Sequence, residues 1–298
     1  MAPPSGERIE PGFAPATEEE VAVPPPPLEL ADPVADCTLQ IEFAEAVSAP
    51  ALWEAQRVLA EQLTKPLAWS GHDGEWRRLG AHDAGRYPAV AASLQLADRQ
   101  GAVGALELSA FLDGVRDIAQ QFGGRVELPQ AQAMLDHATA LDGFCASVDV
   151  QLGVGVVEAA GGDFTGTKIR GLAEAAGMSL QGDGRFHVVD DRGEDVFTLA
   201  NVGAELFDAE TLRTLTTHGL SFTLDVPRVS DGPAAFDRML ATAKQMAQTL
   251  GGILVDGQRH PLHDATIAGI RAKIGEIQKQ MAANQIPAGS PRALRLFS

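Results

Sequence analysis

Seven histidines are the side chains of this chain that most readily bind metals or move protons, and they are scattered along it. His260 and His263 stand three residues apart with Asp256 and Asp264 nearby, which is a set of groups that could bind a metal ion. Pro261 separates the two histidines in a loop that leads into a helix. Solvated loop histidines are the simpler interpretation, so we predict no metal site and no cofactor.

Two cysteines are the next candidates for chemistry. Cys37 and Cys145 are far apart in the chain, and neither belongs to a C-x-x-C pair. Two thiols cannot form a metal cage alone. We interpret them as reduced, half-buried thiols of a cytosolic protein.

The carboxylates do not suggest an active site either. Asp190, Asp191, Glu194 and Asp195 crowd a single turn, whereas general acid–base catalysis needs two carboxylates placed across a cleft. The sequence contains no G-x-S-x-G motif, phosphate-binding loop or Cys-His nucleophile pair. The Gly-Gly pairs at 123 and 251 follow helical patterns and precede strands, so they are typical of helix ends. We predict that the protein is not an enzyme and has no small-molecule substrate.

The length, hydrophobic content and net charge of the chain limit the kinds of partner that it can bind. The chain has 298 residues, enough for two ordinary domains, and 45% of them are hydrophobic. Its 40 acidic residues outnumber 23 basic ones, giving a formal net charge of -17, which argues against nucleic acid or an anionic membrane as partner. The sequence has no apolar run near the roughly 20 residues that a membrane helix needs.

The first 33 residues differ from the rest. They hold many of the 18 prolines of the chain, including the run Pro24–Pro27, which favours an extended polyproline conformation. Such a segment cannot bury enough apolar area to fold alone. We predict a disordered tail or linker over 1–33, and favour a spacer over a ligand for a proline-binding domain.

Residues 184–225 are the stretch that predicts a working surface. Arg185–Val189 and Val196–Val202 flank a Gly/Asp turn, as in a β-hairpin, and Ser221–Val226 forms a third strand. Side chains alternate between the two faces of a strand, so Phe197 and Leu199 share a face that a helix must cover. The opposite face carries Val196, Thr198, Ala200 and Val202. We interpret this open, mildly apolar face as a binding surface.

The pattern of elements occurs twice, which indicates an internal duplication. In each half a long helix ends at Gly-Gly and a short strand follows, and Cys37 and Cys145 are each placed at the start of a first strand. We predict two tandem α/β domains, each a mostly antiparallel sheet with helices on one face and the other face open. Their bounds are 34–142 and 143–283, and a flexible tail covers 284–298.

Four phrases in the second half occur together at characteristic spacing. They are FTLAN at Phe197–Asn201, DVP at Asp225–Pro227, LGG at Leu250–Gly252 and ILVDGQRHPL at Ile253–Leu262. With them, residues 144–283 resemble the C-terminal, FtsZ-binding domain of the bacterial cell-division protein ZipA. The first half is similar only around its helix-Gly-Gly segment, so it resembles a degenerate copy.

The resemblance implies a fold and a site. Domains of this family are α/β sandwiches whose open sheet face forms a shallow apolar groove for the C-terminal tail of FtsZ. The groove positions of the family correspond to Phe186, Ala200, Asn201, Val202 and Thr223. Thr223 stands where the family has a phenylalanine, and Ala204 where it has a lysine. The resemblance therefore implies a smaller groove that lacks one cation.

The resemblance also implies a function. We expect a non-enzymatic cell-division factor that binds the FtsZ tail and helps assemble or stabilise the septal ring. It would act in the cytoplasm, at the division site on the inner face of the inner membrane. ZipA carries a membrane helix and a Pro-rich linker before this domain. The tail at 1–33 resembles the end of such a linker, so membrane contact is expected only through an anchor missing from this chain.

Two points stay open at this stage. The chain either starts downstream of the true start codon or is a soluble relative. The alternative function is that of an adaptor or self-associating structural protein that kept the fold but not FtsZ binding. In the first copy Ala91, Ser93 and Gln95 give a polar open face. We therefore expect that copy to pack against the second one and not to bind the tail.

Overall fold

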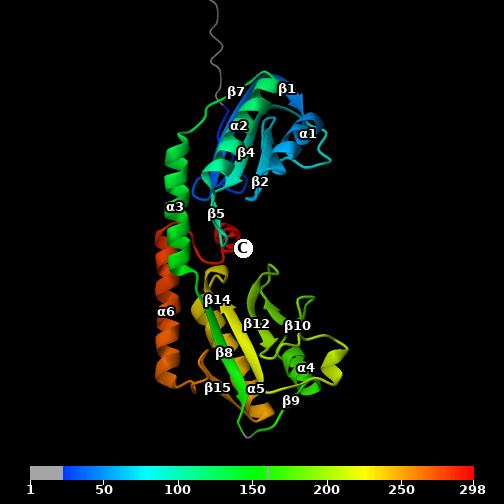
Figure 1. The fold of residues 1–298 in the computed structure, drawn as a ribbon, viewed down its shortest axis with the longest axis vertical. Helices are drawn as coiled ribbons and strands as arrows, with labels where there is room; N and C mark the ends of the chain where they lie inside the picture. The colour runs from blue at the N-terminus through cyan, green and yellow to red at the C-terminus, as the bar shows by residue number, and fades with distance from the viewer. Residues whose placement is uncertain (1–22, 160) are drawn as a thin grey trace, which may run out of the picture.

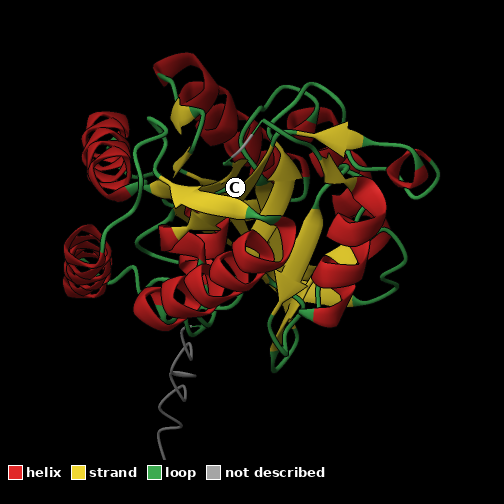
Figure 2. Cartoon of the chain, turned by 90° about the horizontal axis from the view of Figure 1, so that it is seen from below, coloured by secondary structure: helices red, strands yellow, loops and turns green. Residues whose placement is uncertain are grey.

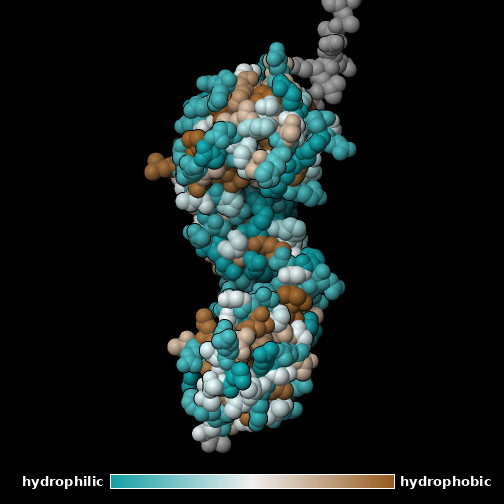
Figure 3. Space-filling view, turned by 90° about the vertical axis from the view of Figure 1, so that its right-hand side faces the viewer, coloured by the Kyte–Doolittle hydropathy of each residue, from teal (hydrophilic) through white to brown (hydrophobic). Residues whose placement is uncertain are grey.

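A computed structural model describes residues 23–159 and 161–298, and most of the predicted N-terminal tail lies outside these residues. The described chain forms two lobes stacked along the long axis of the molecule (Figure 1). In the space-filling view the lobes are two bulges joined by a narrower waist (Figure 3).

The first lobe is built on a five-stranded antiparallel sheet with the strand order β3-β2-β4-β1-β7. Its strands are β1 (Asp36–Ser48), β2 (Leu67–His72), β3 (Trp76–Arg78), β4 (Arg86–Gln95) and β7 (Gly124–Val126). Helices α1 (Ala49–Ala60) and α2 (Ala105–Gln121) pack on one face, and a small hairpin is made by β5 (Ala97–Asp98) and β6 (Gly101–Ala102).

The second lobe carries a six-stranded sheet with the order β10-β11-β12-β14-β8-β15. Its strands are β10 (Ser179–Leu180), β11 (Phe186–Val189), β12 (Asp195–Asn201), β14 (Gly219–Asp225), β8 (Gln151–Glu158) and β15 (Gly252–Val255). A short pair is formed by β9 (Phe164–Thr165) and β13 (Thr216–Thr217). Its helices are α4 (Gly166–Ala175), α5 (Gly232–Leu250) and α6 (Asp264–Ala283), with the 3-10 turns η1 (Thr211–Arg213) and η2 (Val226–Arg228). Both lobes therefore have the predicted α+β fold with antiparallel sheets.

Helix α5 covers the apolar face of the second sheet, as predicted for the face that carries Phe197 and Leu199. Phe197 and Phe222 lie on that face with ring centroids 6.4 Å apart. The buried stripe of α5 consists of Ala235, Phe236, Met239, Leu240, Ala243, Met246 and Ala247. The Asp231 carboxylate caps the helix by accepting a hydrogen bond from Ala234 N at 3.0 Å. Gly251 ends it with a φ of 77°, a left-handed conformation that favours glycine.

The two lobes share the order strand, helix, hairpin, strand, helix, strand and helix, which is the order that a duplication predicts. The hairpins are placed differently in the two sheets. In the first lobe the leading arm, β2, pairs with β4, whereas in the second lobe the trailing arm, β12, pairs with β14. The likeness is therefore one of element order and sheet shape, with a changed position for the hairpin.

Helix α3 (Ala131–Val148) crosses the predicted boundary between residues 142 and 143. Leu141, Cys145 and Val148 are buried at helical spacing along it, so the prediction that Cys145 begins a strand was wrong. The first strand of the second lobe is β8, which starts at Gln151. Glycines in its middle weaken its strand signal in the sequence. α3 and α6 run along the same edge of the molecule, and both appear end-on in the view along the long axis (Figures 1 and 2).

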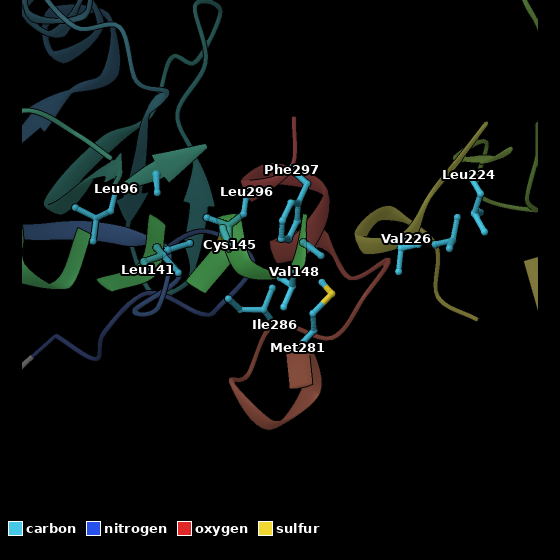
Figure 4. Packing of buried hydrophobic residues seen from close by; sticks show 14 of the residues in the cluster. Leu96, Leu141, Cys145, Val148, Leu224, Val226, Met281, Ile286, Leu296 and Phe297 are labelled. Atoms are coloured by element: carbon cyan, nitrogen blue, oxygen red, sulfur yellow. The ribbon is translucent and has the colours of Figure 1, made fainter. Parts of the chain in front are cut away.

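The C-terminal segment is not the flexible tail that the sequence suggested. It forms α7 (Pro291–Leu296), capped by Ser290, whose hydroxyl accepts a hydrogen bond from Ala293 N. Leu296 and Phe297 are fully buried between the lobes, where they lie near α3 and the end of α6 (Figure 4). A short helix with so few apolar residues has no signature of its own, because its stability comes from the surfaces on either side of it.

Ion pairs also connect the two lobes in the region around α7, which we call the joint. The Arg99 guanidinium lies 2.7 Å from an Asp149 oxygen and 2.8 Å from an Asp225 oxygen, which connects β5–β6 to the second lobe. From α7, Arg292 Nε lies 2.6 Å from Asp32, and Arg295 pairs with Asp36. The first lobe is therefore packed against the second through α3, α7 and these charges.

Residues 27–33 also differ from the predicted disordered tail. Pro27 O accepts hydrogen bonds from Leu30 N at 2.9 Å and Ala31 N at 3.0 Å, which makes a turn. Asp32 follows and is buried in its pair with Arg292. Composition alone did not indicate this order, because the partner residue lies near the other end of the chain.

Candidate functional site

The open face of the second sheet is the candidate site. Cross-strand pairs fix which side chains share it: His187 lies opposite Thr198, Thr198 opposite Thr223, and Ala200 opposite Ser221. Gly153 and Gly155 continue these two rows on β8. A Cβ added to Gly153 would meet nothing within 4 Å, so the centre of the face is a shallow floor of small residues.

Apolar side chains gather at one end of this floor. Val202 is 47% exposed and follows directly after β12, and its N–H donates a hydrogen bond to Gly219 O at 3.2 Å. Val157 lies opposite both Gly219 and Ile253, and Ile253 is 43% exposed. Exposed aliphatic groups this close together on a sheet face provide a place for an apolar side chain of a partner.

A hollow of about 600 Å³ adjoins this apolar end. Its lining includes the predicted site residues Asn201 and Val202 together with Ala204, Val157, His218 and Arg259. Both polar atoms of the Asn201 amide are hydrogen-bonded: Nδ2 donates to Glu205 O at 2.7 Å, and Oδ1 accepts from Thr217 Oγ1 at 2.6 Å. Asn201 therefore holds the loop after β12 in place and thereby positions Val202.

Phe186 does not lie on the open face, and its predicted role in the groove is wrong. It pairs with Leu199 across β11 and β12, so it faces the core, and it is 1% exposed. Its ring packs against Phe207 with centroids 5.4 Å apart. The alternation of the strand places the next residue, His187, on the open face instead. Thr223 lies in the middle of the open face, as its position in β14 predicted.

His187 lies at the opposite end of the face from Val202. Its Nδ1 is 2.8 Å from Asp195 Oδ1 and its Nε2 is 3.1 Å from both Asp183 oxygens, so both ring nitrogens can donate at once only in the imidazolium form. Partial burial alone would lower the pKa of His187. The hydrogen bonds and charges of the two aspartates outweigh it and raise the pKa above the ordinary value of 6.5.

This arrangement predicts a pH dependence of stability. A histidine whose pKa is higher in the folded state stabilises the fold fully below pH 6.5, and the contribution is lost as the pH rises through the native pKa. His187→Gln should therefore reduce the fall in unfolding free energy above pH 6.5, as measured by urea denaturation at several pH values. His82→Gln changes an exposed histidine of the first lobe and serves as the control. Equal pH profiles for wild type and His187→Gln would contradict the assignment.

Arg259 supplies a cation that the sequence comparison of groove positions missed. Its backbone is left-handed, with a φ of 64°, in the turn between β15 and α6. The Asp256 carboxylate holds that turn by accepting hydrogen bonds from Gln258 N and His260 N, each at 2.8 Å. Arg259 lines the same hollow as Ala204, so this edge carries a cation that Ala204 itself does not supply. Only folding brings the two loops together.

Val157 and Ile253 were also missed as site residues. Val157 lies near the end of β8, and Ile253 lies in the short strand that was predicted to follow the Gly-Gly pair at 251. The alternation of Val157 with the buried residues Val154 and Val156 is the signal that could have identified it. Within the described ranges, no group of three or more His, Cys, Asp or Glu side chains is placed to hold a metal ion. No helix of the described chain is long and apolar enough to cross a membrane.

Comparison with known proteins shows which protein family the second lobe is similar to. Residues 151–273 match the family model described as "ZipA, C-terminal FtsZ-binding domain". The chain is 32% identical over 137 residues to the cell division protein ZipA of Marinobacter nauticus, a match that covers 44% of this chain and 40% of that protein. It is 38% identical over 95 residues to ZipA of Stutzerimonas stutzeri, covering 31% of this chain and 35% of that protein.

A third relative, ZipA of Ectopseudomonas mendocina, is 35% identical over 89 residues, or 30% of this chain and 33% of that protein. The chain thus matches less than half the length of each of these relatives. The matched region runs from β8 into α6 and contains the whole open face described above. Residues 151–273 are therefore similar to the ZipA C-terminal, FtsZ-binding domain.

Proposed function

We propose that the open face of the second sheet binds the C-terminal tail of FtsZ, and that the protein is a non-enzymatic cell-division factor. Its role would be to help assemble or stabilise the septal ring at the division site. The family match supports the partner. The observation that carries the site is the aliphatic group formed by the exposed Val202 and Ile253 and the half-buried Val157, beside the hollow that Arg259 lines. Ala200 and Thr223 form the floor next to it.

The size of the apolar group sets the expected affinity. Micromolar binding needs about 8 kcal/mol, and ordering a flexible tail costs roughly 2 to 5 kcal/mol. Each large apolar side chain that a partner buries contributes about 1.5 to 3 kcal/mol. The floor is shallow and Phe186 takes no part, so a tail can bury only a few such side chains. We expect a Kd in the range of tens of micromolar for one chain, on the order of 6 kcal/mol.

The test is a calorimetric titration of the full chain with a synthetic peptide of the FtsZ C-terminal tail from the same organism. Val202→Glu should weaken binding at least about tenfold, because an apolar partner side chain would leave the new carboxylate desolvated and without a hydrogen bond. Val58→Glu is the matched control, since Val58 is 55% exposed on α1 of the first lobe. Circular dichroism checks that both variants are folded. Equal affinity of the two variants would sink the proposed site.

A second candidate function rests on the same exposed group. Aliphatic residues on an open sheet face also form contacts between copies of a chain or with another protein. In that case the peptide would not bind at millimolar concentration, while wild type would self-associate in analytical ultracentrifugation and Val202→Glu would not. The two experiments together separate tail binding from an adaptor role.

A further inference from the structure

The first lobe has a sheet face turned away from α1 and α2, and its centre is buried. Ala91 lies between Ser70 and Gln40 in the pairing register, while Val90 and Ile41 of the neighbouring row face the helices. Ala89 and Ala91 are both 0% exposed. Side chains as small as these cannot cover themselves, so other parts of the molecule must shield them.

The proline-rich segment of the chain itself is hydrogen-bonded to two side chains of this face. Trp76 Nε1 donates a hydrogen bond to Pro24 O at 2.8 Å, and Gln40 Nε2 donates to Val23 O at 3.3 Å. Trp76 belongs to β3 and Gln40 to β1, the strands on either side of β2 and β4. The side chains of Trp76 and Gln40, which come from strands on either side of β2 and β4, therefore donate hydrogen bonds to two consecutive backbone carbonyls on the same face of the sheet as the row of small residues.

This arrangement suits a polyproline ligand. A proline run has no N–H to donate at its prolines, so it offers carbonyl oxygens and ring faces to a groove lined by aromatic groups and polar donors. Trp76 supplies both an indole N–H and a ring, and the His72 ring lies beside it with centroids 5.1 Å apart. Domains that bind proline-rich peptides also use aromatic side chains to contact the ligand.

We propose that this face of the first lobe is a polyproline-binding site and that its occupant is the chain's own segment Val23–Pro27. The turn from Pro27 to Ala31 and the buried pair of Asp32 with Arg292 fix the segment where it leaves the face. Such a short tether gives an effective concentration on the order of 1 mM. If the intrinsic Kd of the segment is about 100 µM, molecules with the segment bound would then outnumber those with it unbound by about ten to one.

The test uses the full chain and an emptied site. In the emptied variant Pro24, Pro25, Pro26 and Pro27 are replaced by Gly, Ser, Gly and Ser. A fluorescently labelled peptide of residues 20–29 is titrated and followed by anisotropy. The emptied variant should bind it with a Kd of about 100 µM, and wild type at least about tenfold more weakly, because its own segment competes.

Adding Trp76→Phe to the emptied variant should abolish peptide binding, whereas adding Trp53→Phe should not, since Trp53 lies on α1 on the other side of the sheet. A measurement on wild type alone does not depend on how the variants fold. The indole N–H of Trp76 should exchange with solvent more slowly than a free indole, because it is bonded to Pro24 O. Fast exchange at Trp76, or a peptide that binds wild type and the emptied variant equally, would overturn the proposal.

Discussion

Replacing Phe297 with alanine is expected to lower the free energy of unfolding by about 3 to 5 kcal/mol. The side chain is 1% exposed, and its ring lies in the joint between the lobes with Leu296, Val148 and Met281 (Figure 4). The Arg99 guanidinium lies over the ring, 5.8 Å from its centroid. Removing the ring leaves a cavity that rigid elements from both lobes cannot readily close, so the loss includes packing as well as transfer from water.

Urea denaturation followed by tryptophan fluorescence measures this loss, because all three tryptophans lie in the first lobe. Leu106→Ala is the control, since Leu106 is 90% exposed in the first turn of α2 and alanine suits a helix. A change below about 1 kcal/mol for Phe297→Ala would mean that α7 is only loosely attached and that the lobes do not depend on it. A transition of the variant that circular dichroism detects and tryptophan fluorescence does not would show that the lobes unfold separately once the joint is weakened.

Replacing Arg99 with methionine is the second large effect that we expect, at about 2 to 3 kcal/mol. The change keeps the aliphatic stem but leaves the Asp149 and Asp225 carboxylates facing each other without their shared cation. The three side chains are between 21% and 29% exposed, so solvent screens part of the repulsion and the estimate lies below that for a fully buried pair.

The pH dependence of the stability of Arg99→Met distinguishes the effect of the lost charge from the effect of lost packing. Burial raises the pKa of Asp225 above its ordinary value even though Arg99 acts in the opposite direction, and removing Arg99 should raise it further. A carboxyl with a raised native pKa favours folding when it is protonated, and this advantage is lost as the pH rises through that pKa. Arg99→Met should therefore cost more stability at pH 7 than at pH 4.

Arg57→Met is the matched control for Arg99→Met. Arg57 pairs with Glu54 and Glu61 on the exposed side of α1, where we expect no measurable loss of stability. If the Arg99 and Arg57 variants unfold at the same urea concentration, or if the loss at Arg99 does not change between pH 4 and pH 7, the charge network does not hold the lobes together.

The sequence by itself determined the features that depend on near neighbours in the chain. Alternation placed Phe197 and Leu199 under a helix and Ala200 and Thr223 on the open face, because successive side chains of a strand point to opposite sides. The Gly-Gly pair at 251 predicted the end of α5, since glycine takes the left-handed conformation at little cost. Two of the phrases that carry the resemblance to the ZipA family, FTLAN and LGG, lie in these same segments.

Tertiary structure decided the features that depend on distant partners. Phe186 turned inward because its register with Leu199 left His187 on the open face, although both residues fitted the predicted strand. Arg259 lines the hollow beside Val202 although it lies in the loop after β15, far from Val202 in the sequence. Residues 27–33 and α7 became ordered through Asp32, Arg292 and Phe297, which lie at opposite ends of the sequence. Local propensity carries no signal for such contacts, because their free energy appears only when the two segments meet.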